Sequence, residues 1–247
     1  MTISLILLTA LTLIAGLAPL FIRKNNSTMF HLALVFSGAY LLGITIVHLM
    51  PELFSGDLGH QEVALWVIIG YFMQLLLNFF TSGVEHGHLH MADDDHQHGS
   101  LTMVTLLAAM SVHALLEGIL LSHVSLVDTY QRSGGLLTGI ILHKMPAAFA
   151  LMSLIRCNYQ GWRWPVFLMI LFSIMTPAGI FFGEYLAQMD WVQSSWLTIL
   201  FALVTGNFLH ISTTILLESS PGHKLNWAKL LVIFAGTALA LLTEFLG

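Results

Sequence analysis

Two histidines and a glutamate lie within stretches of sequence that are otherwise apolar. His113 and Glu117 are four residues apart in one stretch, and His143 lies in the next. This spacing places His113 and Glu117 on one face of a helix, one turn apart. Ionisable groups are costly at bilayer depth and usually mark an ion site, a substrate pathway or a proton relay. The combination of imidazole and carboxylate indicates a divalent metal site.

Three protein ligands would leave room around the metal for water or another group. Such an incomplete site suits transport, because a fully closed cage would not release its ion. The alternative is that each histidine is only a hydrogen-bonded residue of a helix bundle. The proximity of His113 to Glu117, and the pair His143 and Lys144 in the next apolar stretch, favour the metal site.

The composition indicates an integral membrane protein. The chain has 247 residues, of which 57% are hydrophobic and only 9% charged, and its mean hydropathy is +0.84. Soluble domains usually carry about 25% charged residues. A single cysteine, Cys157, excludes an internal disulfide and a cysteine zinc cage. The net charge of −5 gives no indication of nucleic-acid binding.

Eight apolar runs are long enough to cross a bilayer, since a membrane-spanning helix needs about 20 apolar residues. We therefore expect an all-α fold, a polytopic membrane helix bundle that forms one domain over residues 1–247. The first run has no basic residues before it, so we expect a transmembrane helix there and not a cleaved signal peptide. The expected spans cover residues 3–21, 30–50, 63–82, 101–124, 135–155, 165–187, 193–217 and 226–246.

The basic residues predict the orientation of these spans. Six of them follow odd-numbered spans, whereas the opposite side has only Arg132. Cytoplasmic loops carry the excess of Lys and Arg, so we expect both termini outside and residues 83–100 in the cytoplasm. The expected location is the plasma membrane, or the inner membrane in a bacterium. The six residues are Arg23, Lys24, Arg156, Arg163, Lys224 and Lys229.

Several segments resemble the ZIP (Zrt-, Irt-like) family of divalent metal transporters. HALLEG at 113–118 is similar to the fourth-span motif of this family, and HKMPAAFAL at 143–151 is similar to the fifth-span motif. A histidine-rich loop between spans three and four is also typical. Further similar segments are LLGITIVHLMPEL at 41–53, MTPAGIFFG at 175–183 and TGNFLHISTTILLES at 205–219. Their order along nearly the whole chain makes the resemblance specific.

The resemblance implies a metal importer of 3+2+3 architecture, in which spans one to three and six to eight form an inverted repeat around spans four and five. It assigns the transport site to His113, Glu117 and His143. The two-metal version of the family site carries acidic or amide side chains where this chain has Ala114, Lys144, Ala147 and Thr176. We therefore expect a single metal, with the Lys144 ammonium replacing a second cation and pairing with Glu117.

Two further groups of residues have metal-binding character. Five histidines in the segment 83–100 are expected to act as a cytoplasmic metal acceptor, with a disordered linker as the alternative. A second group, on the outer side, is expected to concentrate cations at an entrance, with an ordinary polar loop as the alternative. His210 is either a pathway residue or a hydrogen-bond partner in the bundle. The acceptor residues are His86, His88, His90, His96 and His98, and the entrance residues are His48, Glu52, Asp57 and His60.

The function we expect is import of a divalent metal into the cytoplasm through a site near the membrane midplane on spans four and five, with zinc preferred and iron, manganese, cobalt or cadmium as alternatives. The metal is the transported substrate, and no catalytic cofactor and no enzymatic activity are expected. An intramembrane zinc hydrolase, in which the metal activates water, is the main competitor. Export is a third reading, since a passive carrier runs either way. The expected partners are the metal ion and the lipid bilayer, and nucleic acid is not expected. The sequence does not decide whether the protein forms a homodimer.

Overall fold

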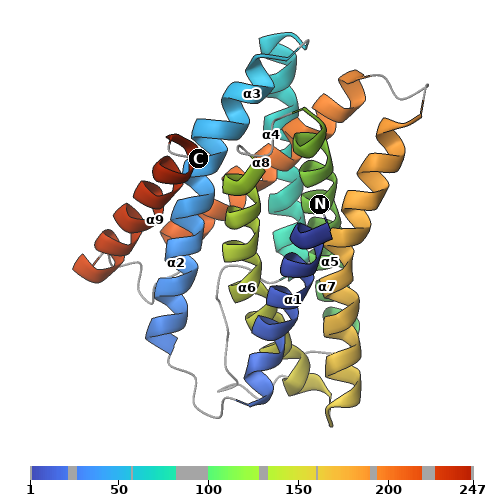
Figure 1. Ribbon diagram of the computed structural model, residues 1–247. Coiled ribbons are helices and arrows are strands. Elements are labelled where there is room, and N and C mark those ends of the chain that lie inside the picture. The colour runs from blue at the N-terminus through green and yellow to red at the C-terminus, as the bar shows by residue number, and fades with distance from the viewer. Residues whose placement is uncertain are drawn as a thin grey trace.

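The computed structural model describes residues 2–21, 27–56, 58–81, 100–127, 133–159, 161–189, 194–218 and 226–245, and nearly all of these are helical (Figure 1). No strand occurs in these ranges, so the expectation of an all-α fold is confirmed there. The histidine-rich segment 83–100 lies outside them except for Ser100. Asp57 lies outside them as well.

A helix occupies each of the apolar runs. The second run is continuous through α2, a π-helical turn η2 and the short helix α3, so the label numbers exceed the span numbers from there on. Among the described residues, seven helices are long and apolar enough to span a membrane, and Leu5–Leu20 is a shorter apolar helix. The elements are α1 (Thr2–Leu17), η1 (Ala18–Leu20), α2 (Ser27–Ile44), η2 (Thr45–Leu49), α3 (Met50–Phe54), α4 (His60–Thr81), α5 (Ser100–Val127), α6 (Ser133–Asn158), α7 (Arg163–Ala187), α8 (Ser194–Glu218) and α9 (Trp227–Phe245).

The outward faces of the bundle are apolar. Large hydrophobic side chains stay exposed on α4, α7 and α9, among them Phe72, Phe181 and Phe234. A soluble monomer rarely exposes such contiguous apolar surface. In a bilayer the same side chains contact lipid tails, so the burial pattern agrees with a membrane protein.

Glycines bring the backbones of α5 and α7 into direct contact. A Cβ added to Gly118 of α5 would collide with the carbonyl oxygen of Thr176 on α7. A Cβ added to Gly179 of α7 would collide in the same way with the carbonyl oxygen of Leu115 on α5. Small residues at such positions allow close packing in membranes, where no hydrophobic force drives helices together.

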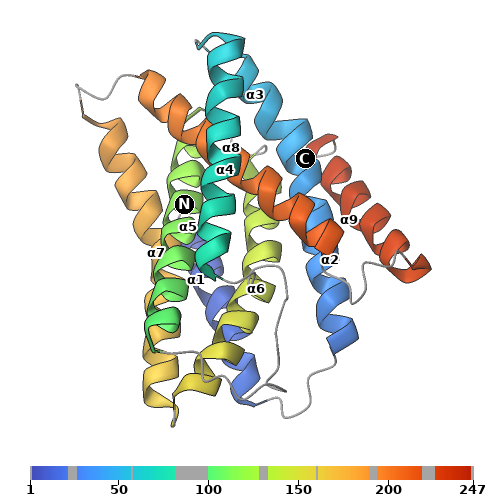
Figure 2. The same cartoon turned by 180° about the vertical axis from the view of Figure 1, so that it is seen from behind.

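The helices α4 and α8 meet by the same device. A Cβ on Gly70 of α4 would collide with the carbonyl oxygen of Leu203, and a Cβ on Gly206 of α8 with that of Val67. Seen from behind, the two helices cross each other (Figure 2). Each of these two crossings leaves no space for even one methyl group.

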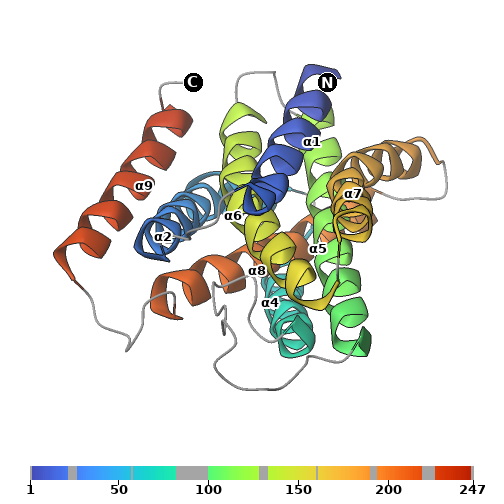
Figure 3. The same cartoon turned by 90° about the horizontal axis from the view of Figure 1, so that it is seen from below.

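These contacts divide the bundle into two groups of helices. In the first group, α7 packs against α5 and α1, and α1 packs against α6. In the second group, α8 packs against α4 and α2, and α2 packs against α9. The groups meet chiefly where α2 lies beside α6, with a smaller contact between α4 and α5. Viewed along the bundle, α2 stands between α9 and α6 (Figure 3).

Two clusters of buried apolar side chains fill the interior. The first cluster draws on both groups, and its members at the junction of the groups are Tyr40, Leu41, Ile44, Leu120, Leu136, Ile140 and Phe208. The second cluster has all its fully buried members on α5, α6 and α7, and they are Met103, Leu106, Met110, Ala114, Ala147, Ala148, Ala150, Leu151, Met152, Ile155, Met169 and Phe172. The buried members of the first cluster therefore join the groups, while those of the second lie within the first group, with Phe30 of α2 packed against them from the second group.

Candidate metal site

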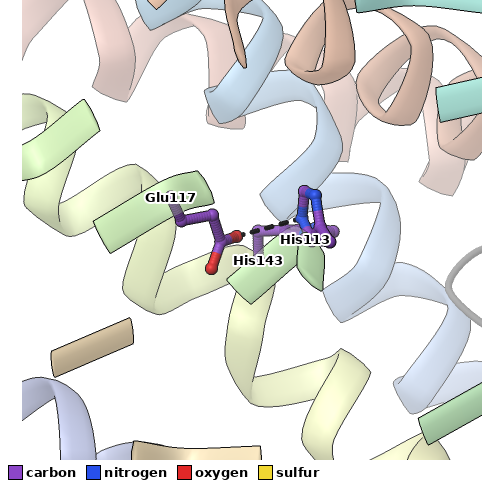
Figure 4. A group of neighbouring side chains, drawn as sticks. All are labelled: His113, Glu117 and His143. Carbon is purple, nitrogen blue, oxygen red and sulfur yellow. Dashed lines mark ion pairs between the residues drawn. The ribbon is translucent and has the colours of Figure 1, made fainter. Parts of the chain in front are cut away.

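The structure brings together His113, Glu117 and His143, the three residues that the sequence singled out. His113 and Glu117 lie one turn apart on α5, and His143 faces them from α6 (Figure 4). One ligand atom from each residue lies within 4.8 Å of the others. The three residues are only 5%, 1% and 1% exposed. Within the described ranges, no other group of His, Cys, Asp and Glu residues meets this criterion.

The geometry of the three side chains fits a metal ion. The Nε2 atom of His113 lies 3.2 Å from Oε1 of Glu117. The imidazole rings of His113 and His143 have their centroids 5.9 Å apart, at 88° to one another. The Nδ1 atom of His143 is buried without a hydrogen-bond partner among the described residues. Zinc binds nitrogen and oxygen ligands at about 2.0–2.2 Å, so small side-chain rotations would direct all three toward one ion.

Lys144 occupies the other side of the same carboxylate. Its Nζ atom donates a hydrogen bond of 2.7 Å to Oε2 of Glu117, and it lies 4.9 Å from the centroid of the Phe172 ring. Both partners of this ion pair are almost fully buried. A buried ion pair of this kind is stable only when both charges remain paired. The two oxygens of Glu117 are thus divided, one toward His113 and one toward Lys144.

Local sequence features explain how the helices present these residues. Gly118 follows Glu117 and permits the close approach of α7, which fixes α5 at the height of the site. Pro146 lies inside α6, three residues after His143. Because proline has no N–H, the carbonyl of Leu142 lacks its usual partner in the helix at this point. Both irregularities lie within one turn of a candidate ligand.

Apolar side chains lie on both sides of the site along the helices. Ala114 and Ala147, next to the ligands, belong to the second cluster. Leu120 and Ile140, about one turn further in the opposite direction, belong to the first cluster. The Phe208 ring, from α8 of the second group, lies 6.4 Å from the His113 ring. The candidate ligands therefore lie where the two clusters meet.

The expected entrance residues are only partly brought together. His48 lies in the π-helical turn η2, a kind of turn that is frequent at functional sites. Its Nε2 atom is 3.7 Å from Oε2 of Glu52, and its Nδ1 atom is 3.2 Å from Oε1 of Glu244. The carboxylates face opposite nitrogens, so the three residues do not converge on one point. His60 is exposed, with its ring centroid 5.8 Å from that of Phe54.

Glu244 is the residue that the sequence did not single out for this cluster. It lies 196 positions from His48, and only the packing of α9 on α2 brings them together. The one available signal was its acidic charge on the same predicted side of the membrane.

The remaining candidates are not part of the group of three candidate ligands. His210, on α8, is buried with its ring centroid 4.9 Å from that of Tyr71 on α4, within the second group. Thr176 is buried on α7, and its Oγ1 atom has no hydrogen-bond partner in the described part of the chain. The five histidines of the segment 83–100 lie outside the described residues. Their expected role as a metal acceptor stays a prediction.

The apolar helix bundle defines the class of the protein as a polytopic membrane protein. Its buried imidazole and carboxylate groups form a candidate metal site. The family model of the ZIP zinc transporters matches residues 82–244. Since this is well over half of the chain, the protein belongs to the ZIP family. The resemblance stated from the motifs is thereby confirmed.

Curated relatives agree with this assignment. The chain is 26% identical over 189 residues to zinc transporter ZIP1 of Danio rerio, in a match that covers 70% of this chain and 60% of that protein. It is 27% identical over 173 residues to zinc transporter ZIP9-B of Xenopus laevis, covering 66% of this chain and 54% of that protein. The chain thus spans a little over half the length of these relatives.

Proposed function

We propose that this protein carries divalent metal ions across the membrane into the cytoplasm, with zinc as the preferred ion and His113, Glu117 and His143 as its ligands. The observation that carries the proposal is the convergence of three buried ligand atoms between α5 and α6. Two imidazoles and one carboxylate suit zinc and also several other divalent metals. Membership of the ZIP family supports transport as the use of this site.

The chemistry of the site agrees with transient binding. Three ligands from the protein leave at least one position for water, so the ion is held without being caged. The charges of Glu117 and Lys144 offset each other before the ion arrives. The metal must therefore compete with the Lys144 ammonium for the electrons of the carboxylate, which weakens binding and favours release.

We further propose that only one metal binds here, because Lys144 takes the place of a second cation. Its Nζ atom, 2.7 Å from Glu117, supports this assignment. The bound-metal stoichiometry of the purified protein tests it. One zinc per chain at the midplane is expected, and a second zinc bound beside Glu117 in the unaltered protein would contradict the assignment.

The proposed architecture is one domain over residues 1–247, with a 3+2+3 order and an inverted repeat around α5 and α6. Both termini lie outside, and the segment 83–100 faces the cytoplasm. Transport requires the first group of helices to slide against the second, so that the site faces each side in turn. The exposed apolar faces of α4 and α9 contact lipid or the second copy of a homodimer.

The hydrolase alternative is not favoured. A zinc hydrolase needs an acid or base beside the metal that is free to exchange a proton with substrate. Lys144, the nearest candidate, is paired with Glu117 at 2.7 Å. The family assignment also indicates a transporter.

Uptake of ⁶⁵Zn²⁺ into proteoliposomes tests the proposed function. We expect the initial rate to fall by roughly 100-fold in His113→Ala and in Glu117→Ala, because each removes one ligand. His31→Ala is the control, since it removes a partly buried histidine of α2 that has no expected role in the pathway. Its uptake rate is expected to stay within about two-fold of the unaltered protein. Equal uptake in His113→Ala and the unaltered protein would contradict the proposal.

A further inference from the structure

Tyr40 links the two groups of helices by its hydroxyl. This tyrosine is fully buried on α2. Its hydroxyl donates a hydrogen bond of 3.0 Å to the carbonyl oxygen of Gly135, in the first turn of α6. It also lies 2.9 Å from Oγ1 of Thr243 on α9. The Thr243 hydroxyl also lies 2.9 Å from the carbonyl oxygen of Ala240, so each of the two hydroxyls faces a carbonyl acceptor, and either one can donate in the contact between them.

The start of α6 is shaped to receive this side chain. A Cβ on Gly139 would lie 3.1 Å from Cε1 of the Tyr40 ring. A Cβ on Gly135 would lie 3.2 Å from Cδ1 of Ile44 and 3.6 Å from Oγ1 of Thr243. The two glycines therefore let α6 lie close against both α2 and α9. Larger residues at these positions would push α6 away from the second group.

Tyr40 contacts α6 on the N-terminal side of the candidate metal site. Gly135, Gly139 and His143 follow one another at intervals of four residues, so they lie along one face of the helix. At 1.5 Å per residue, His143 is about 12 Å from Gly135 along the axis. The face that carries His143 is thus the face that Tyr40 holds at its N-terminal end. Ile140, which lies one turn before Lys144 on α6, is buried in the same first cluster as Tyr40.

Tyr40 belongs to a part of the second group in which α2 and α9 are in close contact. A Cβ on Gly236 of α9 would lie 2.6 Å from the carbonyl oxygen of Phe36 on α2. In addition, Nδ1 of His48, in the turn η2 that continues α2, lies 3.2 Å from Oε1 of Glu244 on α9. The helices α2 and α9 therefore form one unit. By contrast, α6 contacts this unit through the Tyr40 hydroxyl and apolar side chains, which separate without breaking an ion pair.

We propose that Tyr40 is a positioning residue that closes the outer route to His143. Its hydrogen bond to Gly135 holds α6 against α2 and α9, and this bond must break when the site opens to the outside. The inference rests on the proposed function, which gives the site an outer side. Tyr40 then determines how often the site faces outward and does not act as a ligand.

Thiol labelling of intact cells tests this inference. In a Cys157→Ser background, Ile140→Cys reports on the first cluster and Leu151→Cys on the second, since both residues are fully buried on α6. A charged, membrane-impermeant methanethiosulfonate is added outside. Tyr40→Phe, which removes only the hydroxyl, is expected to raise the labelling rate of Ile140→Cys about five-fold, the effect of about one hydrogen bond. Labelling of Leu151→Cys is expected to stay unchanged.

Tyr71→Phe is the matched control, because it makes the same chemical change on α4, away from α6. It should alter neither labelling rate. Thr243→Val provides a second variant that leaves the Tyr40 ring in place, and a smaller increase at Ile140→Cys is expected. An unchanged rate in both Tyr40→Phe and Thr243→Val would overturn the proposal. An equal increase in the labelling rates of Ile140→Cys and Leu151→Cys would indicate general loosening of the bundle and would overturn the proposal too. An increase seen only when the reagent is on the cytoplasmic side would also overturn it.

Transport kinetics separate this role from a purely structural one. If Tyr40→Phe raises a minor outward-facing population five-fold, the external zinc concentration for half-maximal uptake should fall by up to about five-fold. A structural defect would lower the maximal rate and leave that concentration unchanged. If the unaltered protein transports no zinc but Tyr40→Phe still changes the labelling rate of Ile140→Cys, the closing role of Tyr40 is supported and the proposed transport function is wrong. Zinc uptake that depends on His113, with unchanged labelling, would overturn only the closure.

Discussion

The contacts inside the first group of helices differ in kind from the contacts between the groups. Inside the group, α5 and α7 touch backbone to backbone at Gly118 and Gly179, and a buried ion pair joins α6 to α5. Between the groups, α6 meets α2 through the Tyr40 hydroxyl and apolar side chains. The first kind resists sliding, because backbone atoms and charges have no alternative partners nearby. The second kind allows it, because apolar surfaces repack at low cost.

This difference has a consequence for the metal site. His113, Glu117 and His143 all lie on helices of the first group, so the proposed movement of the groups would leave the three candidate ligands together. What would change is the apolar surface that covers them, since the buried members of the first cluster lie on both groups, whereas those of the second lie on the first group alone. The strength of each contact can therefore be tested separately.

The largest effect is expected from Lys144→Ala, which breaks the ion pair within the first group. It leaves the Glu117 carboxylate buried without its cation, a change that typically costs about 4 kcal/mol. The thermal midpoint of the purified protein in detergent should fall clearly. The double variant Glu117→Gln with Lys144→Met removes both charges and should recover most of the stability without recovering zinc uptake. A stable single variant would show that the ion pair does not hold the group together.

A somewhat smaller effect is expected from Gly118→Ala, at the contact of α5 with α7. The new Cβ would meet the Thr176 carbonyl, which belongs to a backbone and cannot rotate away. Overpacking of this kind costs about 3 kcal/mol. Denaturant or thermal unfolding measures it, and uptake should fall with stability. If Gly118→Ala unfolds like the unaltered protein, the rigidity assigned to the first group is wrong.

Acidification of the outside is expected to reduce uptake about ten-fold between pH 7.5 and pH 5.5. A metal must displace protons from imidazole, whose usual pKa is about 6.5. Binding is therefore complete above this range and is lost as the pH falls through it. The measurement is the initial ⁶⁵Zn²⁺ uptake rate as a function of external pH. A rate that stays flat or rises at pH 5 would contradict protonation of the histidine ligands.

The smallest effect on stability is expected from Gly139→Ala, at the junction of the groups. Its Cβ would lie 3.1 Å from the Tyr40 ring, which can move by a few tenths of an ångström. We expect a loss of about 1 kcal/mol or less. The comparison with Gly118→Ala in the same unfolding assay is the sharpest one, because both variants add one methyl group to a buried helix contact. Equal losses would remove the distinction between the two kinds of contact.

Much of the fold and of the site could be predicted from the sequence. Apolar runs of the right length predicted the helices, because a bilayer demands that backbone groups pair within each segment. The i, i+4 spacing predicted that His113 and Glu117 share a face. By contrast, spacing along the chain contains no information on which helices are neighbours. The pairing of Glu244 with His48, and that of Tyr40 with Gly135, therefore could not be predicted.

The sequence by itself determined the class of the protein, its helices, the candidate ligands and the family resemblance, since each depends on residue type and local spacing. Only the tertiary structure decided that the two helix groups are held differently and that the candidate ligands belong to one of them. It also decided that α6 is held against α2 and α9 at the end above His143. The physical reason is that packing in a membrane follows from the shapes of facing surfaces, such as glycine grooves, and these exist only once the helices have assembled.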